Sequence, residues 1–185
     1  MRTHKTLDGQ VALVTGASRG IGKGITLELA AAGAKVYFTA RSTREDPQRP
    51  GTVAATEAQI HDEGGLGVGL VCDHHEDEQV AEAFERIRRD EGRLDLLVNN
   101  ATAEMGSMVG KKFWELPIAL WDDVIGVGLR SHYVASWHAA PLMIAQHHGL
   151  IVNVSSHGSR EYLMGTGYGV GKAGVEKLTR DLAKE

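Results

Sequence analysis

Short apolar runs alternate with amphipathic stretches along this 185-residue chain. The runs are rich in β-branched and aliphatic residues and predict buried strands over 11–15, 35–40, 68–72, 94–98 and 150–154. Apolar positions with a helical period predict helices over 21–32, 53–63, 77–91, 121–146 and 168–184. Strands that alternate with helices form βαβ units. The pattern therefore predicts an α/β fold, a three-layer doubly wound parallel sheet of the Rossmann type.

The spacing also indicates which helix faces turn inward. The apolar faces consist of Ile21, Ile25 and Leu29 in the first helix and Val80, Phe84 and Ile87 in the third. Pro141 is expected to kink the long helix 121–146. The three tryptophans are expected to pack in the core or cover a cleft.

The chain ends inside a predicted helix, at LTRDLAKE, without a C-cap residue. A doubly wound nucleotide-binding fold usually has about six or more parallel strands, which is more than the pattern predicts here. We therefore expect one domain, residues 1–185, that is incomplete at its C-terminus and lacks its last strands.

Composition excludes several classes of function. The formal net charge is -4 and no basic run is present, which argues against nucleic acid or a membrane surface as partner. The single cysteine permits no internal disulfide. No apolar stretch approaches the roughly 18 residues of a membrane span, and the first residues lack the apolar core of a signal peptide. We expect a cytoplasmic protein.

The glycine-rich segment TGASRGIG, residues 15–22, joins the first strand to the first helix. Such a turn brings backbone N–H groups and a helix N-terminus against a pyrophosphate. Side chains at Gly16, Gly20 or Gly22 would obstruct the turn or the ligand. The spacing G-x-x-x-G-x-G, with its strand before and helix after, predicts dinucleotide binding by this turn, to which Ser18, Arg19 and Ile21 also belong.

The end of the second strand bears on the choice of cofactor. It reads Thr-Ala-Arg-Ser over 39–42 and has no acid to bind a ribose 2′-hydroxyl. Arg41 can meet a 2′-phosphate bidentately, and Arg19 can add a second charge. We predict NADP as the preferred cofactor, with NAD as the alternative if these are ordinary solvated arginines.

A second motif, YGVGK, places Tyr168 and Lys172 four residues apart on a predicted helix. A phenol has a pKa of about 10 unless it is perturbed, and a nearby ammonium lowers that pKa. The pair alone is an ordinary exposed helix face. Together with the glycine turn it predicts proton transfer beside a bound nicotinamide.

These motifs, with Asp73 after the third strand, NNA over 99–101 and NVSS over 153–156, occur in an order that resembles the short-chain dehydrogenase/reductase family. The resemblance covers essentially the whole chain. The segment 111–133 is similar to the branch that contains dehydrogenase/reductase member 1.

The resemblance implies roles for the cofactor residues. Asp73 would bind the adenine amino group, and Asn99 would lie beside the adenosine ribose and stabilise the sheet. Ala101 would belong to the same site. Tyr168 would be the catalytic acid/base, and Lys172 would bind the nicotinamide ribose and lower the tyrosine pKa.

The family also has a serine near the end of strand five that holds the substrate oxygen. Counting back 13 residues from Tyr168 gives Ser155. Aligning the strand end gives Ser156, which is the preferred candidate.

One position departs from the family. An asparagine of the long helix that usually holds a water behind the lysine is replaced by Gly128. A backbone carbonyl near Gly128 is expected to anchor that water. The alternatives are that His132 substitutes for it or that the chemistry is impaired.

The sequence as a whole predicts an NAD(P)-dependent, NADP(H)-preferring oxidoreductase that acts on CH–OH groups of a small-molecule carbonyl or alcohol. The alternative is a nucleotide-binding pseudoenzyme or an inactive fragment. We expect a homo-oligomer formed through the long helix and the Tyr168 helix. No metal site is expected, because the pairs His74–His75 and His147–His148 lack a ligand set and indicate solvated loops.

Overall fold

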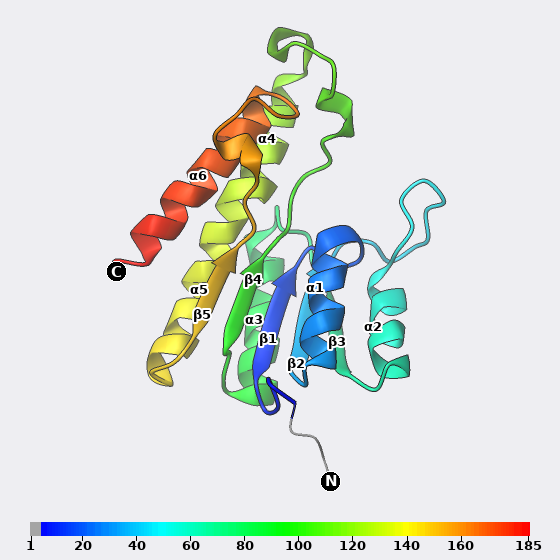
Figure 1. The fold of residues 1–185 in the computed structure, drawn as a ribbon, viewed down its shortest axis with the longest axis vertical. Coiled ribbons are helices and arrows are strands. Elements are labelled where there is room, and N and C mark those ends of the chain that lie inside the picture. The colour runs from blue at the N-terminus through cyan, green and yellow to red at the C-terminus, as the bar shows by residue number, and fades with distance from the viewer. Residues whose placement is uncertain (1–4) are drawn as a thin grey trace.

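A five-stranded parallel sheet with helices on both faces forms the body of the computed structural model, which describes residues 5–185 (Figure 1). The strand order is β3-β2-β1-β4-β5, which is the doubly wound order that the sequence predicts. The strands are β1 (Val11–Thr15), β2 (Lys35–Ala40), β3 (Leu66–Val71), β4 (Leu96–Asn99) and β5 (Leu150–Asn153).

The helices follow the predicted ones within a few residues. They are α1 (Gly20–Ala31), α2 (Val53–Asp62), α3 (Asp77–Glu91), α4 (Ile118–Ile125), α5 (Ser131–Ala145) and α6 (Thr166–Leu182). The predicted helix 121–146 corresponds to α4 and α5, which a π-helical turn over Gly126–Arg130 joins. Helix α5 runs through Pro141 to Ala145 without a break.

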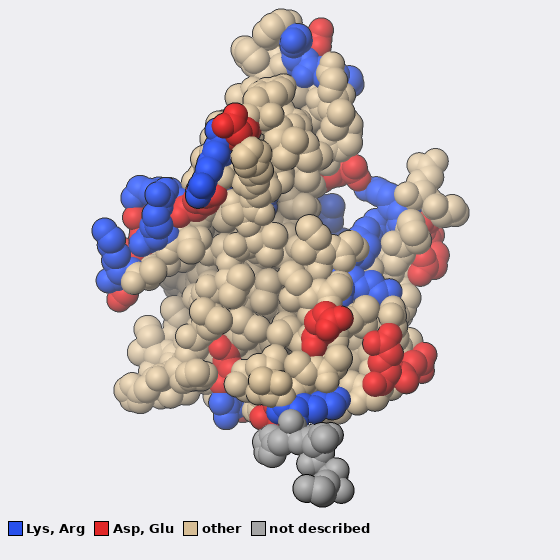
Figure 2. Space-filling view, viewed as in Figure 1, with Lys and Arg blue, Asp and Glu red and all other residues tan. Residues whose placement is uncertain are grey.

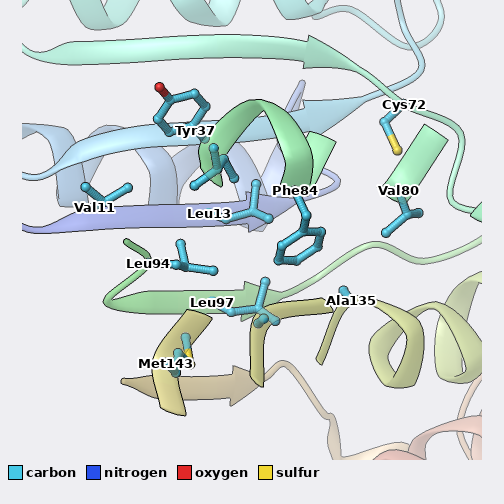
Figure 3. Close-up of a cluster of buried hydrophobic side chains, with 12 residues drawn as sticks. Val11, Leu13, Tyr37, Cys72, Val80, Phe84, Leu94, Leu97, Ala135 and Met143 are labelled. Carbon is cyan, nitrogen blue, oxygen red and sulfur yellow. The ribbon is translucent and has the colours of Figure 1, made fainter. Parts of the chain in front are cut away.

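Two cores lie on opposite faces of the sheet because alternate residues of a strand point to opposite sides. Ala12 and Val14 of β1 pack with residues of α1 and α2. Leu13 packs on the other face with Phe84 of α3 and Ala135 of α5 (Figure 3). The inward face predicted for α3 is confirmed, since Val80, Phe84 and Ile87 are buried.

The apolar face predicted for α1 is wrong at its first residue. Ile21 is 68% exposed, and the buried positions are Gly22, Thr26 and Ala30. Small residues bring this helix close to β1, so its larger side chains lie at the margin of the core. The expectation that the tryptophans pack in the core is also wrong, because Trp114 and Trp137 are 70% and 63% exposed.

Helix α6 lies beside α4 and the π-helical turn, next to β5 at the edge of the sheet. This arrangement brings the Tyr168 segment to the end of the sheet at which the strands terminate (Figure 1). No helix of residues 5–185 is long and apolar enough to cross a membrane.

Two histidines lie inside the fold. For His74 this contradicts the expectation of a solvated loop, whereas its neighbour His75 is exposed. His74 is 6% exposed and His132 is completely buried. His74 contacts the Thr39 hydroxyl at 2.8 Å, and His132 contacts the Ala101 carbonyl oxygen at 3.1 Å. Burial lowers the pKa of each imidazole to about 4, so both are neutral at neutral pH.

These histidines should make the fold sensitive to mild acid. In the unfolded chain a histidine takes up a proton near pH 6.5, whereas the buried imidazoles remain neutral until about pH 4. Stability is therefore lost as pH falls through this window, by about 2 kcal/mol per histidine between pH 7 and pH 5. Urea unfolding at the two pH values measures this loss.

His74→Gln should reduce that loss, whereas His148→Gln, at an exposed position, should leave it unchanged. Equal free energies of unfolding at pH 7 and pH 5 in the unmodified chain would contradict the prediction. The comparison stops at pH 5 because most carboxylates titrate below it.

Candidate functional site

A cleft of about 1090 Å³ lies at the carboxyl ends of the strands. The glycine turn forms one wall, and the segment after β4 forms another. The end of β2 and the loop after β3 line the same cleft. In open α/β sheets this is where ligands bind, at the point where the strand order changes direction.

The glycines of the turn permit close contact between two chain segments. Gly16 has a φ of 71°, and a Cβ there would lie 2.7 Å from the Cα of Ala101. A Cβ at Gly22 would lie 2.3 Å from the Gly16 carbonyl oxygen. Gly20 has open space around it but a φ of 56°, which a side chain would strain. Side chains at Gly16 and Gly22 would therefore clash with the backbone, and one at Gly20 would strain the turn.

The N-terminus of α1 opens into this cleft. Arg19 occupies the N-cap position without a capping hydrogen bond from its side chain, and no acidic residue lies in the first turn. Gly20, Ile21 and Gly22 of that turn and Ser18 before it line the cleft. The positive end of the helix dipole therefore faces a space that an anion can enter, which fits a dinucleotide pyrophosphate.

Asn100 fastens the glycine turn to the segment after β4, a role that the sequence reasoning missed. Its side-chain amide donates to the carbonyl oxygens of Thr15 at 2.9 Å and Gly16 at 3.0 Å. The Thr15 hydroxyl accepts from the backbone N–H groups of Asn100 and Ala101. The NNA motif, in which Asn100 stands between Asn99 and Ala101, was the sequence signal that could have identified this role.

Asn99 points the other way, into the protein below the cleft. Its amide donates to Asn153 Oδ1 at 2.8 Å, to Ser136 Oγ at 3.1 Å and to the His132 carbonyl oxygen. These contacts join β4 to β5 and α5. The structure thus places Asn99 in the sheet, while Ala101 lines the cleft.

The end of β2 carries the expected positive charge. Arg41 pairs with Asp73 at 3.4 Å, so both lie at the same end of the cleft. Arg19 donates to Ser42 Oγ at 2.5 Å and to the Gly51 carbonyl oxygen at 3.0 Å. Partial burial opposes ionisation of Asp73, but the His75 N–H and the Arg41 guanidinium hold its pKa below the usual value.

Tyr168, Ser156 and Lys172 come together where β5 ends and α6 begins. The Tyr168 hydroxyl donates to Ser156 Oγ at 2.9 Å. Lys172 Nζ lies 5.9 Å from the centre of the tyrosine ring and donates to the Val154 carbonyl oxygen at 2.8 Å. Tyr168 and Lys172 are 8% and 6% exposed, and burial lowers the pKa of the lysine.

The two candidate serines occupy different positions. Ser156 Oγ accepts from Tyr168 and from the Gly158 N–H at 3.0 Å. Its own proton is therefore free to be donated to a third oxygen. Ser155 Oγ instead lies 3.5 Å from the Lys172 carbonyl oxygen, on the backbone of α6. The geometry favours Ser156 as the serine beside the phenol.

Gly128 lies in the π-helical turn, and such turns are frequent at functional sites. A Cβ there would meet nothing nearer than Thr102 Oγ1 at 3.8 Å, so the glycine leaves room rather than allowing close packing. His132, one turn later, uses Nε2 for the Ala101 carbonyl, and its buried Nδ1 has no partner among residues 5–185.

Comparison with known proteins gives matches over nearly the whole chain. The family model described as short chain dehydrogenase matches residues 10–185. Dehydrogenase/reductase SDR family member 1 of Homo sapiens is 48% identical over 183 residues, and that of Mus musculus is 45% identical. These matches cover 97% of this chain but 56% of either relative, so the chain spans little more than half their length.

Other relatives extend the likeness. The 3-oxoacyl-acyl-carrier-protein reductase FabG of Pseudomonas aeruginosa is 37% identical over 181 residues, which are 97% of this chain and 69% of that protein. The crystal structure of a metagenomic short-chain oxidoreductase in complex with NADP superposes with a TM-score of 0.84 at 36% identity. That match covers 96% of this chain and 76% of the other.

The close contact at Gly22 can be tested by comparing two alanine substitutions in one helix. Gly22→Ala should lower the free energy of unfolding by about 2 kcal/mol or more, because its Cβ would clash with the Gly16 backbone. Gly24→Ala should raise it by about 0.5–1 kcal/mol, because nothing lies within 4 Å of that Cβ and alanine favours helix. Equal effects of both substitutions in urea unfolding would show that the turn is not tightly packed.

Proposed function

This chain belongs to the short-chain dehydrogenase/reductase family, in the branch of dehydrogenase/reductase member 1, and from that premise we propose an NADP(H)-preferring oxidoreductase. It interconverts a carbonyl and a secondary alcohol of a small molecule. The observation that carries this proposal is the convergence of Tyr168, Ser156 and Lys172 at the sheet end that also holds the glycine turn.

The residues that would hold the dinucleotide fit it in charge and shape. The turn from Gly16 to Gly22 offers a helix N-terminus to the pyrophosphate, and Asp73 would bind the adenine amino group. Arg41 and Arg19 lie where a 2′-phosphate would add charge, and a 36% identical neighbour was solved with NADP. NAD remains the alternative cofactor. When bound, the nicotinamide would supply or accept the hydride.

The protein's own part is to move a proton and hold the reacting oxygen. In the reductive direction the Tyr168 hydroxyl donates its proton to the carbonyl oxygen, and the Ser156 hydroxyl donates a hydrogen bond to the same oxygen. The Lys172 ammonium stabilises the phenolate that remains. In the oxidative direction the phenolate takes the proton back. Lys172 would also bind the nicotinamide ribose.

The surroundings of the phenol favour an apolar substrate. Tyr168 packs in a cluster with Met108 and Val127, and Met105 and Met164 lie against it. Met105 and Met164 also line the cleft. Methionine side chains are flexible and adapt to irregular apolar shapes. Met164 has a φ of 62°, an uncommon backbone conformation of the kind found at functional sites.

We also propose that the chain forms a homo-oligomer through the long helix and α6. Large apolar side chains of these elements are exposed, among them Trp121, Tyr133 and Trp137 of the long helix and Val170 of α6. Burial of these side chains between two copies of the chain would remove apolar surface from water.

The roles of Tyr168 are tested by Tyr168→Phe. This variant should lose turnover of a carbonyl substrate by about 100-fold or more, because it removes the proton donor. It should keep NADPH binding and fold, since phenylalanine fills the same space. Initial rates with a panel of apolar ketones and fluorescence titration with NADPH measure the two properties.

Tyr162→Phe is the matched control, because Tyr162 is 77% exposed in the preceding loop and its substitution should leave turnover unchanged. A verified activity that survives Tyr168→Phe would contradict the mechanism. Binding of NADPH by the unmodified chain without turnover of any carbonyl would favour a nucleotide-binding protein that is not an enzyme.

Another experiment concerns the water that family members hold behind the lysine equivalent to Lys172. We propose that a backbone carbonyl near Gly128 anchors it, because the glycine leaves open space at that position. His132 is the alternative, through its buried Nδ1, which has no partner among residues 5–185. With the carbonyl as anchor, His132→Ala should keep kcat within about threefold in protein shown to be folded by circular dichroism. A folded variant that has lost kcat by tenfold or more would assign the role to the histidine.

A further inference from the structure

An ion pair links two loops across the mouth of the cleft. Arg49 belongs to the loop between β2 and α2, and Glu104 belongs to the segment after β4. Arg49 Nη1 lies 2.5 Å from Glu104 Oε2, although the residues are 55 positions apart in sequence. Both line the cleft. Figure 2 shows acidic and basic side chains meeting beside a hollow at the right of this face.

The base of the Arg49 loop is fixed to the protein. Thr52 caps α2 by accepting from the Ala55 N–H at 3.0 Å and is 5% exposed. The Gly51 carbonyl accepts from Arg19, and a Cβ at Gly51 would lie 2.3 Å from the Ser18 carbonyl oxygen. A turn from Asp46 to Arg49, closed by a 2.9 Å backbone hydrogen bond, then presents the Arg49 side chain.

The exposure of the pair leaves both side chains accessible to other partners. The two side chains are 56% and 55% exposed, and exposed ion pairs contribute little to stability. The Arg49 guanidinium, the Gly106 N–H and, more weakly, Arg19 hold the pKa of Glu104 below its usual value, so Glu104 is an anion at neutral pH. A carboxylate and a phosphate oxygen present the same kind of acceptor to a guanidinium.

We propose that the Arg49–Glu104 pair is a latch over the cofactor cleft, in which Glu104 holds Arg49 until a phosphate of the dinucleotide replaces the carboxylate. The inference rests on the proposed function, because it needs a phosphate-bearing ligand in this cleft. Arg49 would add to the charge of Arg19 and Arg41, and Glu104 would compete with the ligand for that charge.

Equilibrium titration and stopped-flow fluorescence with NADPH and NADH test the exchange. Arg49→Gln should raise the Kd for NADPH about tenfold, because a charged hydrogen bond to phosphate is lost. Glu104→Gln should lower that Kd about threefold and raise the association rate, because it removes the closer of the two carboxylates beside Arg49, the other being Asp46 at 3.5 Å. An effect on NADPH alone places Arg49 at the 2′-phosphate, and an equal effect on NADH places it at the pyrophosphate.

Glu85→Gln and Arg88→Gln are matched controls. This pair on α3 is 2.6 Å apart and similarly exposed, but it lies outside the cofactor cleft. Neither control should change any Kd by more than about twofold.

The charge-swapped double variant, Arg49→Glu with Glu104→Arg, distinguishes two roles of the pair. In one, a phosphate replaces Glu104 on Arg49; in the other, the ion pair only joins the two loops. It can rebuild the ion pair but offers a phosphate no cation at position 49. NADPH binding as weak as in Arg49→Gln supports the latch, and recovery of normal binding overturns it.

Two further results distinguish a failure of the latch from a failure of the proposed function. If the unmodified chain binds NADPH and both single variants bind as the controls do, the latch is contradicted and the proposed function stands. If the unmodified chain binds neither dinucleotide, the proposed function is contradicted and the latch with it.

Discussion

The close approach of the glycine turn to the segment after β4 is the constraint on which the rest of the site depends. Gly16 and Gly22 can carry no side chain because the Ala101 and Gly16 backbones occupy that space. Asn100 and Thr15 then fasten the two segments with four hydrogen bonds. The cleft, its helix N-terminus and the position of Ala101 in its wall follow from this contact.

The candidate catalytic residues lie at the same end of the sheet, on the segment after β5 and on α6. Because β4 and β5 are parallel and in register, with Asn99 opposite Asn153, the residues after β5 emerge beside the cleft. The Ser156 hydroxyl then meets that of Tyr168, 12 residues later in the chain, and Lys172 lies one helical turn after Tyr168 on α6. Burial of Lys172 lowers the pKa of its ammonium, and the Val154 carbonyl oxygen accepts a hydrogen bond from it.

Local patterns predicted the strands, the helices and both motifs, because each is a property of neighbouring residues. The remaining features depend on pairings distant in sequence. Spacing alone left Ser155 and Ser156 open, since the path of the loop decides which hydroxyl reaches Tyr168. The roles of Asn99 and Asn100 differ because adjacent residues point to opposite sides. The burial of His74 and the Arg49–Glu104 pair involve partners that no periodicity reveals.

The central claim is that one cleft holds both a dinucleotide and the phenol of Tyr168. A crystal structure of the chain with NADPH tests it most directly. We expect the pyrophosphate at the N-terminus of α1 and the nicotinamide beside the Tyr168 hydroxyl. A dinucleotide bound away from the glycine turn, or a nicotinamide out of reach of that hydroxyl, would contradict the account.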